Sequence, residues 1–284
     1  MQVKQVLDHL GHKEFGSYFE ADFNADPAPT LHELMYDGKN SENWTRAAEE
    51  VGIFLAKFRG FAEKGNVKDP EAADFSSPSA LYDWLQTLGS SKEAYLNILP
   101  DRIREPYSHS VDHLQKRAAE AVALLQQGSY VCLQNALAKN IKLKDSQIRL
   151  DGNNIHARYG PDSLDASIFL SDMFVVYFKQ TGHLEHKVQY QTVDTAQKFG
   201  QAFDEQIGRL NASEDERKQF WANVSLLTGW EVIRRYVTKD NVQEILARAE
   251  HDPASVVECG LRLINNVNIK NPNFLVAVAL ALLF

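Results

Sequence analysis

The sequence predicts a mostly α-helical protein with a small β-hairpin near its centre. Apolar residues recur at three- and four-residue spacing on both sides of the centre, which is the period of a helix with one buried face. Strand-like segments concentrate in the middle, where Ile141–Leu143 and Ile148–Leu150 flank a polar turn and predict a hairpin. Downstream, Ser213 and Glu216 form a capping-box sequence, in which each side chain can bond the other residue's backbone amide at the start of a helix.

Before the hairpin, residues 1–40 form a mixed region and the pattern then becomes helical. Ser17–Phe23 alternates as a strand does, and a proline-containing stretch ends it. Residues 101–109 predict a polar connection between helices. The helices expected around it begin at Ser41, after Ser77-Pro78, within Ser90–Leu99 and at Val111, the last one ending near Gln127.

The stretch from Tyr130 to Phe178 predicts a short strand, a polar loop, the hairpin, and a glycine- and asparagine-rich turn. A buried helix follows, entered through Tyr159-Gly160-Pro161. The remainder is expected to be helical over Thr192–Leu210, from Ser213 to Arg234-Arg235, after Asp252-Pro253, and in the apolar tail Phe274–Phe284.

Composition points to a cytoplasmic protein that binds neither nucleic acid nor membrane. A net charge of −8 repels nucleic acid and anionic lipid. Cys132 and Cys259 each lie among apolar residues, which favours free thiols in a reducing compartment. The first residues lack the apolar core of a signal peptide, and the tail Phe274–Phe284 is shorter than the roughly 20 residues of a membrane span. We expect this tail to be a buried helix, or a helix that binds a partner protein or a second copy of the chain.

Two separated motifs carry a family resemblance. The first is Tyr159-Gly160-Pro161 followed by Asp165, and the second is Gly229-Trp-Glu-Val-Ile-Arg234-Arg235. In this order they resemble segments of aminoglycoside-phosphotransferase-like small-molecule kinases, and within that group the methylthioribose kinases most. The resemblance implies the C-lobe of a protein-kinase-like fold, mostly α with a small β-hairpin element.

The resemblance is weakest before the first clear helix. Such kinases carry a five-stranded nucleotide lobe with a glycine-rich loop and a strand lysine that grips the phosphates. Residues 1–40 contain no G-x-G loop and no V-x-x-K strand, and Lys4 and Lys13 lie in helical context. We therefore expect a reduced N-terminal segment over residues 1–40 and a helical kinase-like C-lobe over residues 41–284, with its central hairpin at about 130–160.

The family's catalytic loop, H-G-D-x-x-x-x-N, aligns with Leu133 to Asn140. Asn135 takes the place of the aspartate that accepts the proton of the attacking hydroxyl, and an amide cannot act as that base. Leu133 takes the place of the histidine. Asn140 retains the asparagine that binds a metal ion in the family.

The family's second metal motif, D-x-E, has two alignments. Without a gap it falls on Asn153-Asn154-Ile155, which replaces both carboxylates; with a two-residue insertion it places Asp151 there, with Asn153 as its neighbour. Asparagine is a neutral ligand, and magnesium on a triphosphate needs anionic oxygens. No cofactor is expected, and ATP with magnesium would be bound only if phosphoryl transfer persists.

The other residues of interest allow two interpretations each. Asp165 would bond the loop backbone as in the resembling kinases, or cap its own helix. Arg234-Arg235 would bind an anionic ligand through guanidinium forks, or pair with buried acids such as Asp165. His109 and His113 share a helix face, but without a third ligand they do not predict a zinc site.

Polar residues of the loop and turn would line the mouth of the kinase-like cleft. They could hold a polar small molecule, or merely form a turn. The predicted site comprises Asn135 and Asp151 at catalytic positions and Lys139, Asn140, Asn153, Asn154, His156, Arg158, Arg234 and Arg235 as ligand-binding residues, with Asp165 supporting the loop.

The loss of the nucleotide lobe, the base and the metal carboxylates argues against ATP-dependent phosphoryl transfer. We therefore expect a degenerate kinase-like protein, a pseudokinase, that binds a polar or anionic small molecule or plays a regulatory role. The alternatives are an enzyme that uses the cleft for other chemistry, a small-molecule phosphotransferase completed by a partner, and a structural interaction partner. The sequence leaves open whether the protein is an enzyme.

Overall fold

The computed structural model describes residues 7, 13–37, 41–62, 79–144, 147–180, 186–238, 253–266 and 268–280, and it confirms the mostly helical architecture. The first half contains η1 (Lys13–Tyr18), β1 (Phe19–Glu20), η2 (Phe23–Ala25), α2 (Leu31–Asp37), α3 (Ser41–Phe61), α4 (Ala80–Leu88), α5 (Lys92–Asn97), α6 (Asp101–Ser108) and α7 (Val111–Gln126). The second half contains β2 (Tyr130–Gln134), η4 (Ala138–Asn140), β3 (Ile141–Lys144), β4 (Gln147–Asp151), β5 (His156–Gly160), α8 (Leu164–Gln180), α9 (His186–Arg209), α10 (Glu214–Val237), α12 (Pro253–Asn265) and α13 (Pro272–Leu280).

Five short strands form two small sheets in the described part of the chain. The predicted hairpin is confirmed as β3 and β4, which pair antiparallel with Ile141 opposite Leu150. β1 extends this sheet by pairing parallel with β4, in the order β1-β4-β3. β2 and β5 form the second sheet, antiparallel over five residue pairs from Tyr130–Gly160 to Gln134–His156.

Three local predictions were wrong. Of Ser17–Phe23, expected to be a strand, only Phe19 and Glu20 form one, because η1 extends to Tyr18 and η2 begins at Phe23. Residues 101–109, expected to be a polar connection, form α6, which begins after Pro100 with Asp101 in its first turn and buries Ile103. The stretch after Asp151 is not a turn throughout, because His156–Gly160 forms β5. Its backbone groups are satisfied by pairing with β2, a partner that local sequence patterns do not reveal.

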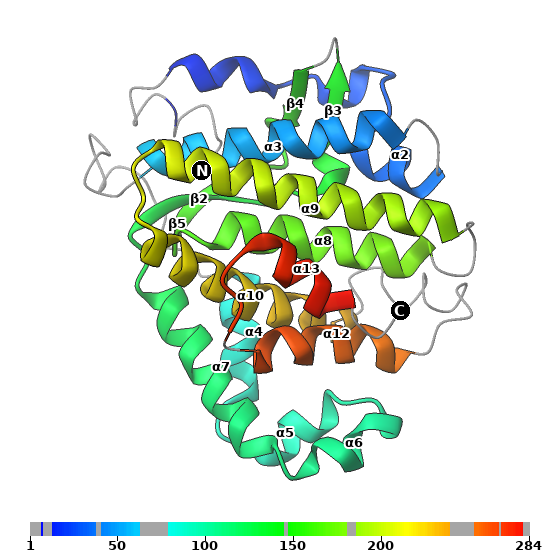
Figure 1. Ribbon diagram of the computed structural model, residues 1–284, viewed down its shortest axis with the longest axis vertical. Coiled ribbons are helices and arrows are strands. Elements are labelled where there is room, and N and C mark those ends of the chain that lie inside the picture. Colours follow the sequence, from blue (N-terminus) through cyan, green and yellow to red (C-terminus); the bar gives the residue numbers. More distant parts are fainter. Residues whose placement is uncertain are drawn as a thin grey trace.

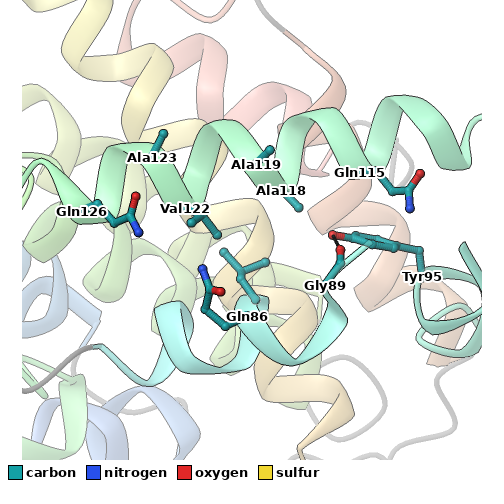
Figure 2. Close-up of a pocket in the computed structure, with 10 residues that line it drawn as sticks. Gln86, Gly89, Tyr95, Gln115, Ala118, Ala119, Val122, Ala123 and Gln126 are labelled. Atoms are coloured by element: carbon teal, nitrogen blue, oxygen red, sulfur yellow. Dashed lines mark hydrogen bonds between the residues drawn. The ribbon is translucent and has the colours of Figure 1, made fainter. Parts of the chain in front are cut away.

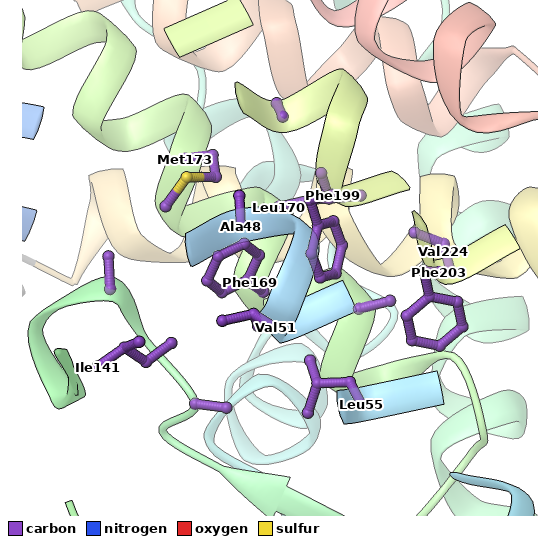
Figure 3. Packing of buried hydrophobic residues seen from close by; sticks show 14 of the residues in the cluster. Ala48, Val51, Leu55, Ile141, Phe169, Leu170, Met173, Phe199, Phe203 and Val224 are labelled. Atoms are coloured by element: carbon purple, nitrogen blue, oxygen red, sulfur yellow. The ribbon is translucent and has the colours of Figure 1, made fainter. Parts of the chain in front are cut away.

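Helices α3, α9 and α8 form three neighbouring rows that enclose the first hydrophobic core (Figures 1 and 3). Phe169 and Phe199 contact each other in it, with ring centroids 4.5 Å apart and ring planes tilted by 39°. α3 and α9 approach closely because Gly52 has no side chain: a Cβ there would lie 2.6 Å from the Phe199 carbonyl oxygen. Figure 3 shows Val51 and Leu55 of α3 facing this aromatic pair.

A second core lies among α4, α5, α7, α10 and α12 at the other end of the molecule (Figure 1). Trp230 of α10 is fully buried there, with its ring centroid 6.2 Å from that of Trp84 and 6.3 Å from that of Tyr95. α10 opens on the predicted capping box, in which the Ser213 hydroxyl accepts from the Glu216 amide and the Glu216 carboxylate accepts from the Ser213 amide. Because α10 contributes to both cores, it joins the two ends of the fold.

The described part of the apolar tail is α13. Leu275, Val276, Ala279 and Leu280 are buried against the protein, whereas Phe274 keeps 42% of its surface exposed. Residues 281–284 of the tail lie outside the described residues. Within the part of the chain that the structure describes, no helix combines the length and apolar character needed to cross a membrane.

The close crossing of α10 and α12 predicts that a side chain at Gly229 destabilises the protein. A Cβ at Gly229 would lie 2.6 Å from the Gly260 carbonyl oxygen, so Gly229→Ala should lower the free energy of unfolding by roughly 1–3 kcal/mol through overpacking. At Gly208 of α9 the nearest atom is the flexible end of Arg217 at 3.2 Å. Gly208→Ala should therefore be neutral or raise stability by up to about 1 kcal/mol, the helix-propensity difference. Urea unfolding of the two variants tests this, and equal effects would contradict it.

Candidate functional site

The loop between β2 and β3 is held in one shape from within. Asn135 adopts the left-handed conformation, φ 63°, which asparagine tolerates better than most residues. Its carbonyl oxygen accepts a 2.8 Å hydrogen bond from the buried Asn140 side chain. Its own side chain is exposed and donates across to the Asn154 carbonyl oxygen at 3.4 Å. Asn140 is therefore a brace of the loop, and Asn135 connects the loop to the turn after β4.

Two buried aspartates of α8 accept hydrogen bonds from the backbone, one at the end of β2 and one in the loop that follows it. Asp165 Oδ1 accepts a 2.8 Å hydrogen bond from the Leu133 amide. Asp172 Oδ2 accepts a 2.8 Å hydrogen bond from the Ala138 amide. The two carboxylates lie on one face of the helix because they are seven residues apart, about two turns. Asp165 thus makes the backbone contact that the resemblance implies for it, and Asp172 is a second anchor that sequence analysis missed.

The two anchors differ in their electrostatics. Burial raises the pKa of Asp165 to about 7, although the Leu133 hydrogen bond and the charge of Arg158 act in the opposite direction. Burial also acts to raise the pKa of Asp172, but the charges of Arg235 and His32 and the hydrogen bonds from Ala138 and Arg235 together outweigh it and hold the pKa below its ordinary value. Asp172 is therefore a carboxylate at neutral pH, whereas Asp165 titrates there.

Arg234 and Arg235 are engaged by acids of the protein itself. Arg234 binds both oxygens of Glu231 at 2.8 Å. Arg235 donates to Glu231 at 2.9 Å and to Asp172 at 2.7 Å, and it is only 8% exposed. The acids are thus Glu231 and Asp172, and neither arginine makes a described ion pair with Asp165. In the contacts described for this cluster, two arginines meet two carboxylates.

The turn after β4 is organised by Asp151, which is buried. Its Oδ1 accepts from the Asn153 and Asn154 amides at 2.9 and 3.2 Å, and its Oδ2 accepts from the Asn154 side chain at 2.6 Å. These bonds form an Asx-type turn and occupy both oxygens. The Asn153 side chain donates to the Ala21 carbonyl oxygen at 2.6 Å. Asp151 therefore shapes the turn, and its oxygens do not face an open site.

The structure leaves some of the predicted site residues exposed and buries others. Lys139, Asn154 and His156 are exposed near Asn135, on the loop, the turn and the first residue of β5. Arg158 is 3% exposed and pairs in register with Cys132. Burial lowers its pKa to about 10, while the charges of Cys132, Asp83 and Asp165 raise it.

A cover segment, Phe19–Asp26, lies over the hairpin. The Lys142 ammonium donates to the carbonyl oxygens of Phe23 and Asp26 at 2.6 and 2.7 Å, and it lies 4.4 Å from the Phe23 ring centroid. The Gly152 amide donates to the Glu20 carbonyl oxygen at 3.0 Å. Sequence analysis did not single out Lys142, and its alternating strand context gave no signal for this role.

The residues present do not fit magnesium and ATP. The metal would require carboxylate oxygens, but those of Asp151 are occupied, and Asn135 and Asn153 are neutral. In the described ranges, no three histidine, cysteine, aspartate or glutamate side chains are grouped so that they could hold a metal ion. His109 and His113 belong to the described residues and are not part of such a group.

Comparison with known proteins identifies the fold. The chain matches no family model and no curated protein. It is similar to the solved structure of glucosamine kinase in complex with glucosamine, ADP and inorganic phosphate, at TM-score 0.52 and 14% identity, covering 84% of this chain and 58% of that one. It is also similar to glucosamine kinase in crystal form B, at TM-score 0.51 and 15% identity, covering 83% and 60%. The chain spans less than two thirds of either kinase, and at these identities the likeness establishes a kinase-like fold alone.

Asp165 should make stability depend on pH in a defined direction. Its folded pKa of about 7 exceeds the ordinary 3.8, so the folded protein keeps a proton that the unfolded chain releases between these values. The contribution of Asp165 to stability is fully present below about pH 4 and falls until about pH 7, by up to about 4 kcal/mol. The difference in unfolding free energy between wild type and Asp165→Asn should fall over this range. A difference that does not change with pH would contradict this.

Arg235 should be critical for stability. Arg235→Ala leaves Asp172 buried without its arginine and removes one of the two arginines that bind Glu231. The substitution should lower the free energy of unfolding by about 3–5 kcal/mol. Arg209→Ala is the matched control, because its 3.8 Å pair with Glu205 is about 70% exposed on both sides. The control should change stability by less than about 0.5 kcal/mol. Equal losses in urea unfolding would refute the structural role of Arg235.

Proposed function

We propose that this kinase-like protein holds an uncharged polar small molecule at its loop and turn and transfers no phosphoryl group. The proposal rests on one observation: the groups that phosphoryl transfer would use are either replaced or already engaged within the protein. Asn135 stands at the position of the base, and Asp151 uses both oxygens to build a turn. In-line transfer depends on a base or positioned nucleophile and on metal-held phosphates.

The same contacts favour an uncharged ligand over an anionic one. The arginine pair is balanced by Glu231 and Asp172, so an anion would have to displace buried carboxylates. Exposed groups around the loop in the described part of the chain include the amide of Asn135, the imidazole of His156 and the Lys139 ammonium, whereas the exposed Asn154 amide already donates to Asp151. Amides donate and accept hydrogen bonds equally well, which suits hydroxyl groups.

Binding of ATP with magnesium should be absent. A ligand that binds the folded state raises its melting temperature, so ATP with magnesium should give no concentration-dependent shift. Asn135→Asp restores a carboxylate at the base position, and the left-handed conformation tolerates aspartate. This variant should still show no ATP hydrolysis, because the metal-binding carboxylates are not restored. A magnesium-dependent shift or turnover in either protein would overturn the proposal.

Binding of a polar small molecule should depend on Asn135. Sugars and amino sugars are suitable probes, beginning with glucosamine, the ligand of the similar solved kinase. A saturable rise in melting temperature should be lost in Asn135→Ala. Asn211→Ala is the matched control, since Asn211 is also left-handed, φ 66°, but lies between α9 and α10. If both variants lose the response equally, or no probe produces one, the ligand-binding proposal fails.

A further inference from the structure

A cavity of about 280 Å³ lies between α4 and α7, away from the loop and turn. Figure 2 shows α7 along one side, with Gln115 and Gln126 at its two ends and Gln86 on the opposite wall. The lining residues are Leu85, Gln86, Gly89, Tyr95, Gln115, Ala118, Ala119, Val122, Ala123 and Gln126.

The cavity exists because one face of α7 carries small side chains where α4 passes over it. Ala118, Ala119, Val122 and Ala123 follow helical spacing, so they share this face. Its end wall is fixed by Tyr95, which is 2% exposed and whose hydroxyl donates to the Gly89 carbonyl oxygen at 3.2 Å. The Tyr95 ring in turn packs edge-on against the buried Trp230, which makes this wall rigid.

Along α7 the polar groups of the cavity lie at its two ends, and the exposed Gln86 lies on the opposite wall. The Gln115 amide donates to the Ser90 carbonyl oxygen at 2.7 Å, and the Gln126 amide donates to the Tyr82 hydroxyl at 3.0 Å. These bonds orient each amide and leave its carbonyl oxygen as an acceptor. The two glutamines are about 16 Å apart along the helix axis, because eleven residues separate them. The α7 side of the lining is therefore apolar in the middle, with acceptors at both ends.

No charged side chain belongs to the 10 lining residues. Burying an ion here would cost its hydration without an opposite charge in return. A cavity of this size has room for about nine non-hydrogen atoms, if each occupies the roughly 30 Å³ of a water molecule.

We propose that this cavity binds an uncharged aliphatic molecule of about that size with hydrogen-bond donors such as hydroxyl groups at its ends. The proposal is independent of the ligand proposed for the loop and turn. The aliphatic chain lies on the alanines, and the terminal hydroxyl groups donate to the Gln115 and Gln126 carbonyl oxygens.

Heptane-1,7-diol is the probe, and its diammonium analogue of equal length, 1,7-diaminoheptane, is the charged control. Methyl NMR of the whole protein should show saturable shifts for Ala119, Val122 and Ala123 with the diol, and at least tenfold weaker binding of the diamine. Ala119→Leu fills the cavity from its exposed side and should weaken diol binding at least tenfold. Ala277→Leu, an exposed alanine on α13, should leave it unchanged.

Methyl signals of the first core serve as the check that Ala119→Leu remains folded, because that core lies apart from α4 and α7. Absence of saturable shifts in the wild-type protein, equal binding of the diamine, or undiminished binding by a folded Ala119→Leu variant would each overturn the proposal. Asn135→Ala should bind the diol as the wild type does, so failure of the loop proposal leaves this test intact.

Discussion

Two buried carboxylates on one face of α8 hold the loop between β2 and β3, and the polar centre depends on them. Asp165 binds the backbone at Leu133 and Asp172 binds it at Ala138, so the loop keeps its shape whatever side chains it presents. The pKa values of the two acids are shifted in opposite directions. Asp172 has Arg235 at 2.7 Å, whereas burial dominates at Asp165 and raises its pKa to about 7.

Several polar residues around this loop make contacts that hold the fold together. Asp151 organises a turn, Lys142 fixes the cover segment, and Arg235 joins α10 to α8 through Asp172. A buried charge cluster of this kind adds little net stability over an apolar equivalent, but it is costly to break. The geometry of the kinase-like framework therefore rests on residues beneath the loop.

Sequence analysis succeeded where structure is set by neighbouring residues. The hairpin alternation, the capping box at Ser213 and the apolar stripe of α7 are local signals, and each predicted its element. β5 was missed because its pairing partner, β2, is distant in sequence. The same holds for the site: Asp172, one of the two ion partners of Arg235, is 63 residues away from it, and the exposure of a charged side chain depends on such partners. The resemblance to kinases gave the fold but could not supply these contacts.

The cover segment is held through its main chain as well as through side-chain ion pairs of Glu20 with Arg149 and of Asp26 with Lys144. Lys142, Asn153 and the Gly152 amide all donate to backbone carbonyl oxygens of this segment rather than to its side chains. Most exposed positions of the segment can therefore change identity without loss of these bonds. Deleting or inserting a single residue is different, because it moves every later carbonyl out of reach of its donor. The spacing of these carbonyl oxygens therefore constrains the length of the segment.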